Sequence, residues 1–210
     1  MSYTRWLALA ALVTAAACSN DSPTRIPAGQ GLVHLQLTDA PFPFDSVKSV
    51  DIFVVRIDAK LADADSAECE KHLDDAAKDS SEWVTLAEPN RSIDLVALRG
   101  GKVSDIGQKA LPVGTYRTLR LIIDPTKSSV SLKNGVVLTR TSLPAVYFPS
   151  AARSGIKVKL SKPVEVTEGN AATLTIDFSL DESFEIVGKS IQRFGLLFKP
   201  VIRATIAAGM

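Results

Sequence analysis

The sequence contains few of the residues that usually carry chemistry. Its 210 residues include 2 cysteines, 2 histidines and 2 tryptophans. Two histidines offer little material for a catalytic triad, and the chain has no nucleophile elbow or comparable motif. Two cysteines cannot supply a framework of several disulfides. We therefore expect a protein that is not an enzyme and that uses no cofactor.

An excess of charge of one sign is also missing. The chain has 24 basic and 23 acidic residues, and the basic ones are scattered between acidic ones. A surface that follows nucleic-acid phosphates needs Lys and Arg gathered in excess on one face. We expect no nucleic-acid partner.

A hydrophobic run long enough to cross a bilayer is missing too. Residues 6–13 are almost entirely apolar, but a spanning helix needs about 20 such residues. One arginine precedes this run, and residues 14–17 are small. This order is typical of a secretory signal peptide, so we expect residues 1–17 to be removed by cleavage between Ala17 and Cys18.

The alanines directly before Cys18 resemble the lipobox of bacterial lipoproteins, although leucine is commoner at the position of Ala15. The resemblance implies that the Cys18 thiol takes a diacylglycerol and that Cys18 becomes the acylated N-terminus. Ser19 resembles the signal for sorting to the outer membrane, on its periplasmic or surface face. The alternative is ordinary secretion, because Ala15 and Ala17 also suit the standard signal peptidase; Cys18 could then pair with Cys69 in an oxidising compartment.

The rest of the chain has the length of one folded domain. Residues 18–30 contain Ser, Pro, Gly and polar side chains, a composition typical of a flexible tether. We expect a domain over residues 31–206. Residues of about 60–81 are acidic and poorly amphipathic, and we interpret them as an insert between strands.

Alternation of apolar and polar residues with period 2 is the main structural signal. It occurs at residues 33–37, 156–160 and 172–180, and the segments 47–57, 116–123, 136–138 and 196–202 are rich in β-branched and aromatic residues. These patterns predict an all-β fold, an antiparallel β-sandwich with little helix. Asn134 and Gly135 predict a hairpin turn of type I′, and Asp94 predicts the N-cap of a single helical turn.

Five short motifs follow one another in a recognisable order. They are GLVHLQLTDAP at residues 31–41, a valine-rich strand, WVTL at 83–86, IDLVAL at 93–98 and LPVGTY at 111–116. This order resembles the domain of unknown function 4382, over about residues 30 to 205. The resemblance implies a transthyretin-like β-sandwich found in envelope lipoproteins, with no established activity.

The sequence gives only weak support for a metal site or a catalytic site. Cys69 and His72 have a spacing that zinc uses, but a structural zinc site takes four ligands and no second pair exists. The carboxylates of the acidic insert could attract calcium, but their spacing lacks the glycine of the usual calcium loop; they are Asp63, Asp65, Glu68 and Glu70, with Asp58 nearby. We expect His34 to be a surface or edge residue, and Asp39 to bond the amides of its own turn. The alternative is a secreted metal-dependent or carbohydrate-active protein that uses these acidic loops.

Two surface features could bind a partner. Trp83 could form a sugar-stacking platform if the fold brought it to Tyr116, Tyr147 and Phe148, although packing in the core or at an edge is the simpler expectation. The Pro-Phe-Pro-Phe segment at residues 41–44 is a candidate binding loop. We expect a lipid-anchored envelope domain of unknown activity, a binding or structural module that reaches the membrane through its lipid and meets an envelope protein or glycan.

Overall fold

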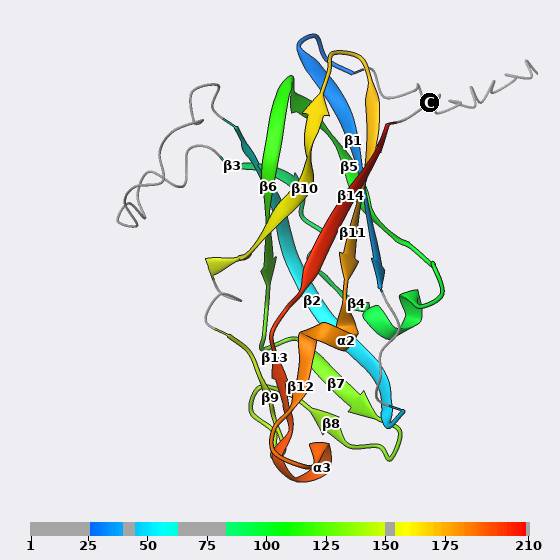
Figure 1. Ribbon diagram of the computed structural model, residues 1–210, viewed down its shortest axis with the longest axis vertical. Coiled ribbons are helices and arrows are strands. Elements are labelled where there is room, and N and C mark those ends of the chain that lie inside the picture. The colour runs from blue at the N-terminus through cyan, green and yellow to red at the C-terminus, as the bar shows by residue number, and fades with distance from the viewer. Residues whose placement is uncertain (1–25, 40–44, 63–82, 150–153, 209–210) are drawn as a thin grey trace, which may run out of the picture.

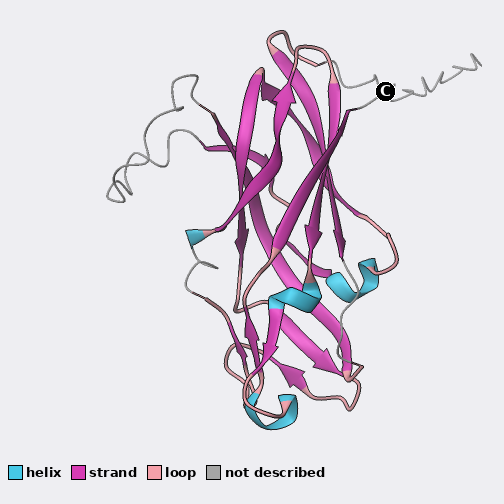
Figure 2. Cartoon of the chain, in the orientation of Figure 1, coloured by secondary structure: helices cyan, strands magenta, loops and turns pink. Residues whose placement is uncertain are grey.

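The computed structural model describes residues 26–39, 45–62, 83–149 and 154–208. Two β-sheets pack face to face over most of the length of the molecule, and a small third sheet lies at its lower end (Figure 1, Figure 2). The predicted all-β sandwich with little helix is confirmed. In the described part of the chain no helix is both long enough and apolar enough to cross a membrane.

The three sheets contain fourteen strands. Sheet A has the order β14 (Ile202–Ala208), β11 (Ala171–Phe178), β1 (Gln30–Asp39), β5 (Ser104–Pro112). Sheet B has the order β10 (Ile156–Val166), β6 (Gly114–Ile123), β2 (Val47–Leu61), β7 (Ser129–Leu132), β8 (Val137–Leu138), and β3 (Trp83–Ala87) and β4 (Arg91–Asp94) also pair with β2. Sheet C has the order β12 (Phe184–Ile186), β13 (Leu196–Phe198), β9 (Val146–Tyr147). The described residues also form the short helices η1 (Leu95–Leu98), α2 (Leu180–Ser183) and α3 (Ile191–Phe194).

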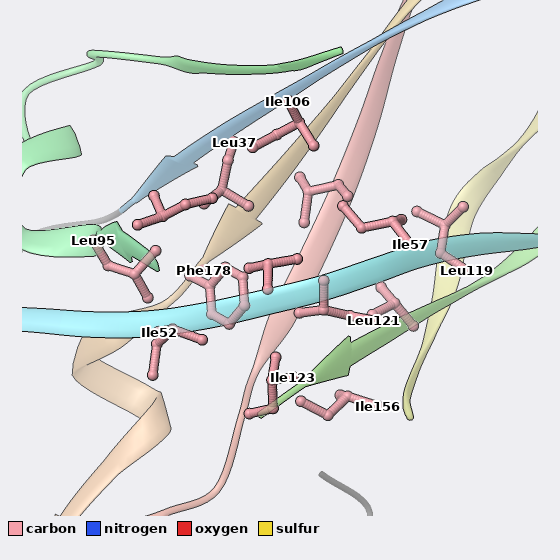
Figure 3. Close-up of a cluster of buried hydrophobic side chains, with 14 of the residues drawn as sticks. Leu37, Ile52, Ile57, Leu95, Ile106, Leu119, Leu121, Ile123, Ile156 and Phe178 are labelled. Atoms are coloured by element: carbon pink, nitrogen blue, oxygen red, sulfur yellow. The ribbon is translucent and has the colours of Figure 1, made fainter. Parts of the chain in front are cut away.

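The core lies between sheets A and B. In β1 every second residue from Gly31 to Asp39 is buried, as the period of 2 requires for a strand with one face inside. The close-up shows Leu37 and Phe178 from sheet A near Ile52 and Leu121 from sheet B (Figure 3). Burial of these aliphatic and aromatic side chains supplies the main stabilisation of the fold.

Two strand pairs are parallel in an otherwise antiparallel fold. Strand β1 pairs with β11 in parallel, with Thr38 opposite Asp177 and Asp39 opposite Phe178, and β9 pairs with β13 in parallel. Alternation within one strand identifies its buried face but not the direction of its neighbour. The β1–β11 pair matters for the site because each strand carries a carboxyl group near its end, on opposite faces of the sheet.

The hairpin at Asn134 and Gly135 is present, but its predicted turn type is wrong. The Gly135 amide donates to the Leu132 carbonyl at 3.1 Å, and Gly135 has φ of +88°. A type I′ turn needs positive φ at both central residues, and Asn134 has none. The three-residue loop instead places its single left-handed residue at Gly135.

Two predicted strand ends also differ from the structure. The segment 196–202 divides into β13 and β14, because Pro200 has no amide hydrogen to continue a ladder. Strand β11 ends at Phe178, and Leu180 begins α2. The predicted helical turn after Asp94 is confirmed as η1, with the Asp94 carboxylate accepting from the Val96 amide at 3.0 Å.

The start and the end of the described chain lie at one end of the sandwich. Figure 1 shows the beginning of β1 and the end of β14 at the top, and sheet C, α3 and the β7–β8 hairpin at the bottom. The register agrees, because Ala172 near the start of β11 pairs with Ala208. The tether predicted from the sequence therefore joins the domain at the end opposite sheet C.

Candidate functional site

Several residues that the sequence singles out lie outside the described residues. They are Ala17, Cys18, Asp63, Asp65, Glu68, Cys69, Glu70, His72 and the segment 41–44. The expectations about lipid, zinc, calcium and the Pro-Phe-Pro-Phe loop therefore remain predictions. The other candidates lie within the described residues, which contain two groups of charged side chains and a separate pair formed by His34 and Asp105.

The first group lies where β1 and β11 end. Asp39 is 5% exposed, on the same face of sheet A as the core residue Phe178. Neither of its carboxylate oxygens has a hydrogen-bond partner. The expectation that Asp39 bonds the amides of its own turn is wrong, because its side chain points toward the core.

Burial makes the Asp39 carboxyl a weaker acid than an aspartate in water. Loss of solvation raises its pKa from 3.8 to about 7, and the negative charge of Asp177 adds to the rise. The Leu180 amide and the Arg99 guanidinium oppose it. The Leu180 amide is close enough to act electrostatically without the geometry of a hydrogen bond. Asp39 is therefore a group that can hold a proton near neutral pH.

Asp177 lies on the other face of sheet A. Its register partners are Thr38 and Arg203, and burial raises the pKa of its carboxyl while Arg203 lowers it. Arg203 donates to both oxygens of Glu182, at 3.0 and 2.9 Å, and to the Ser179 hydroxyl. Arg203 is therefore shared, and one oxygen of Asp177 has no partner.

These carboxyl groups do not form a metal site. Across the described ranges, no group of three or more Asp, Glu, His and Cys side chains is arranged to hold a metal ion. Asp39 and Asp177 belong to opposite faces of one sheet, so they do not converge on one cation. The group can take up and release a proton, and we see no further chemistry that it supports.

The second group lies on the outer face of sheet B. Asp58 of β2 is 1% exposed, and both of its oxygens are bound. Arg120 of β6 donates to one oxygen through two nitrogens, at 2.8 and 3.1 Å. Arg56 lies 3.0 Å from the other oxygen, to which the Thr85 hydroxyl also donates at 3.1 Å. The carboxylate is thus fully paired.

Trp83 completes this group. Its ring lies 4.3 Å from the Arg120 guanidinium carbon, a distance typical of a cation–π contact. Because Thr85 and Trp83 both belong to β3, the group fastens this edge strand to β2 and β6. Sequence reasoning missed Asp58 as a structural centre. The signal that could have found it is the register: Asp58 faces Thr85 and Arg120 on its two neighbouring strands.

His34 forms a separate pair on sheet A. Its Nε2 lies 3.1 Å from an Asp105 oxygen, and this contact is the main cause that lowers the pKa of Asp105. A backbone bond from Gly107 lowers it further. His34 is half-buried and lies on the outer face of β1, so the contact ties β1 to the edge strand β5.

The fold does not bring the four aromatic residues together into a platform, and Trp83 packs at an edge strand as expected. Tyr116 is buried and donates to the Pro112 carbonyl at 3.0 Å. Phe148 packs against Phe198, with ring centroids 5.4 Å apart. Trp83 belongs to β3 of sheet B and Tyr147 to β9 of sheet C. The four aromatic residues are therefore distributed over core, edge and lower end.

A family comparison matches most of this sandwich. The model of a domain of unknown function, DUF4382, matches residues 30–200. The chain belongs to the DUF4382 family. The match begins at the first residue of β1 and ends just before β14. No curated protein matches the chain significantly.

The lower end of the DUF4382 domain carries a group of exposed apolar side chains. Eight large apolar residues are exposed in the described part of the chain, and six of them belong to this end: Val136, Val137, Leu143, Tyr147, Ile186 and Phe194. We call these six residues the apolar end. Leu143 is 95% exposed and Tyr147 is 47% exposed. Such gathering is uncommon, because exposed apolar residues are usually scattered singly.

The segments that carry the apolar end are bonded to one another. The Val146 amide donates to the Thr139 carbonyl at 2.8 Å, and the Leu196 amide donates to the Ala145 carbonyl at 3.0 Å. Strand β13 lies between β9 and β12. The exposed side chains are therefore held on one connected support rather than on separate loops.

Proposed function

We propose that this DUF4382 protein is a lipid-anchored domain of the cell envelope that acts as a binding or structural module and not as an enzyme. Cys18, directly after the small residues of the signal peptide, carries the lipid. The outer membrane is its location, because Ser19 follows the cysteine. The observation that carries the proposal is the run of small residues 15–17 followed directly by Cys18.

The arrangement of the domain supports this reading. Residues 18–30 would leave the anchor and enter β1 at the upper end in Figure 1. The apolar end would then face away from the membrane that holds the lipid. A surface of this kind suits a module that makes contact at a distance from its own anchor.

The charged groups support a module rather than an enzyme. Asp58 has both oxygens bound by Arg120, Arg56 and Thr85, and His34 is paired with Asp105. Side chains engaged in this way hold strands together. A general base must be within hydrogen-bond reach of a substrate proton, and the fully paired Asp58 carboxylate is only 1% exposed.

The test is the mass and the detergent partitioning of the protein expressed with its own signal. We expect the wild-type protein to enter the detergent phase and to carry the mass of a diacylglycerol and an N-linked acyl chain. Cys69→Ser is the matched control, because it removes the other cysteine and should leave both properties unchanged. Cys18→Ser should lose both. A soluble wild-type product whose mass shows a Cys18–Cys69 disulfide would contradict the proposal.

A further inference from the structure

Basic residues outnumber acidic ones in the segments that carry the apolar end. Segments 133–149 and 184–199 contain Lys133, Arg140, Lys189, Arg193 and Lys199, against the single acidic residue Glu185. The whole chain has almost equal numbers of basic and acidic residues, so this excess is local. Apolar side chains with a basic surround are typical of surfaces that meet anionic membranes.

Most of these basic side chains are available for an external partner. Lys199 pairs with Glu185 at 2.7 Å. Lys133, Arg140 and Lys189 are exposed and make no ion pair with any described residue. The Arg193 guanidinium lies 5.3 Å from the centre of the Phe194 ring. An anionic partner would therefore meet cationic groups that need not first break an internal salt bridge.

The charge argues against a second copy of this chain as the partner. A two-fold contact would place the same surface on both sides, and like charges directly opposed cost free energy. A protein partner also needs about 800 Å² of closely matched surface on each side. The side chains here come from two loops, three short strands and one helical turn. A fluid lipid surface requires no such match of shape.

We propose that the apolar end inserts into the headgroup region of an anionic phospholipid surface. Leu143 and Tyr147 enter the boundary between headgroups and acyl chains, where the amphipathic tyrosine ring is favoured. Arg140 and Lys189 contact lipid phosphates. This inference goes beyond the lipid anchor, because it concerns a second membrane contact at the opposite end of the molecule.

The test uses the full chain with Cys18→Ser, which cannot carry the lipid. Its result therefore does not depend on whether the proposed lipid anchor exists. The small residues before position 18 still suit ordinary signal peptidase, so we expect a cleaved product without lipid. Binding is measured by co-sedimentation with vesicles of phosphatidylglycerol and phosphatidylcholine, and with vesicles of phosphatidylcholine alone. We expect binding to the anionic vesicles and much weaker binding to the neutral ones.

Matched variants locate the contact. Leu143→Ser with Tyr147→Ser should weaken binding at least about tenfold, because it removes the side chains that enter the lipid. Arg140→Glu with Lys189→Glu should weaken binding by a similar factor, because it replaces two cations with two anions at an anionic surface. Val103→Ser with Val113→Ser changes the two exposed large apolar residues of the described chain that lie outside the apolar end and should have no effect. Thermal unfolding confirms that each variant is folded.

Three results would overturn the proposal. They are equal binding by all folded variants, equal binding to neutral and anionic vesicles, and no binding to either vesicle. The last result would leave an acidic protein as the partner that fits the same surface.

Discussion

Asp39 places a carboxyl group on the core face of β1 without a hydrogen-bond partner. Its pKa is raised to about 7, so the folded state holds a proton that the unfolded state releases at about pH 4. The contribution of Asp39 to the free energy of unfolding should therefore be highest below about pH 4. It should fall as pH rises toward 7, by a few kcal/mol, since one pKa unit corresponds to about 1.4 kcal/mol.

Urea unfolding across this pH range measures the effect. Asp39→Asn, which keeps the shape and cannot ionise, should remove most of the fall in stability between about pH 4 and 7. Asp45→Asn is the control, because Asp45 is exposed and its replacement should leave the fall in place. If Asp39→Asn retained the wild-type pH dependence, the side chain would not be the group that titrates.

Asp58 presents the opposite case of a buried carboxylate whose oxygens are all bound. Asp58→Asn should lower the free energy of unfolding by about 3 kcal/mol, because it leaves the charge of the mostly buried Arg120 without its partner. Glu185→Gln removes an exposed ion pair with Lys199 and should cost less than about 1 kcal/mol. Equal losses in chemical denaturation would show that the Asp58 group is not a structural centre.

At the scale of elements, the sequence predicts where the strands lie in the chain better than it predicts which strands pair with one another. Alternation within each strand depends on which face is buried, so β1, β6 and β11 are recognisable from their residues alone. The parallel pairing of β1 with β11 depends on a contact between segments more than 130 residues apart. Sheet C was not predicted, because strands of two or three residues are too short to show a period.

The candidate sites were predicted less well for the same reason. Asp94 as an N-cap depends on its nearest neighbours in the chain, and that prediction is confirmed. The pairing of Asp58 with Arg120 joins residues 62 positions apart. The apolar end joins segments near residues 136–147 with segments near 186–194. Neither group has a local pattern that the sequence could reveal.

Gly195 is the residue on which the position of sheet C depends most clearly. It has φ of +86°, and a Cβ atom there would collide with the backbone oxygen of Ala145. Gly195→Ala should therefore separate β13 from β9 and speed hydrogen exchange of the Leu196 amide. Gly169→Ala, at a turn with positive φ and open space around it, should cost only about 1 kcal/mol and leave sheet C protected. Unchanged exchange at Leu196 in the Gly195→Ala protein would contradict this.

At the scale of the whole molecule, the start of β1 and the apolar end lie at opposite ends of the sandwich (Figure 1), so the proposed anchor would be joined to the domain at the end away from the apolar end. Gln30 already belongs to β1, so the predicted tether has at most the 12 residues 18–29. A chain of this length would extend to about 40 Å at most, at about 3.5 Å per residue, and its mean extension as a flexible chain would be about 20 Å. A short tether of this kind favours contact of the apolar end with a second membrane over contact with the membrane that holds the lipid.

The lipidated protein should therefore link two membranes. When wild-type protein in neutral donor vesicles is mixed with anionic acceptor vesicles, light scattering should rise as the vesicles cluster. Cys18→Ser should bind the acceptors without clustering them, because it lacks the anchor. Leu143→Ser with Tyr147→Ser should stay in the donors without clustering, because it lacks the second contact. A different result would contradict this arrangement: wild-type protein that needs both the anchor and the apolar end for membrane binding but never clusters vesicles. Both contacts would then be made with the same membrane.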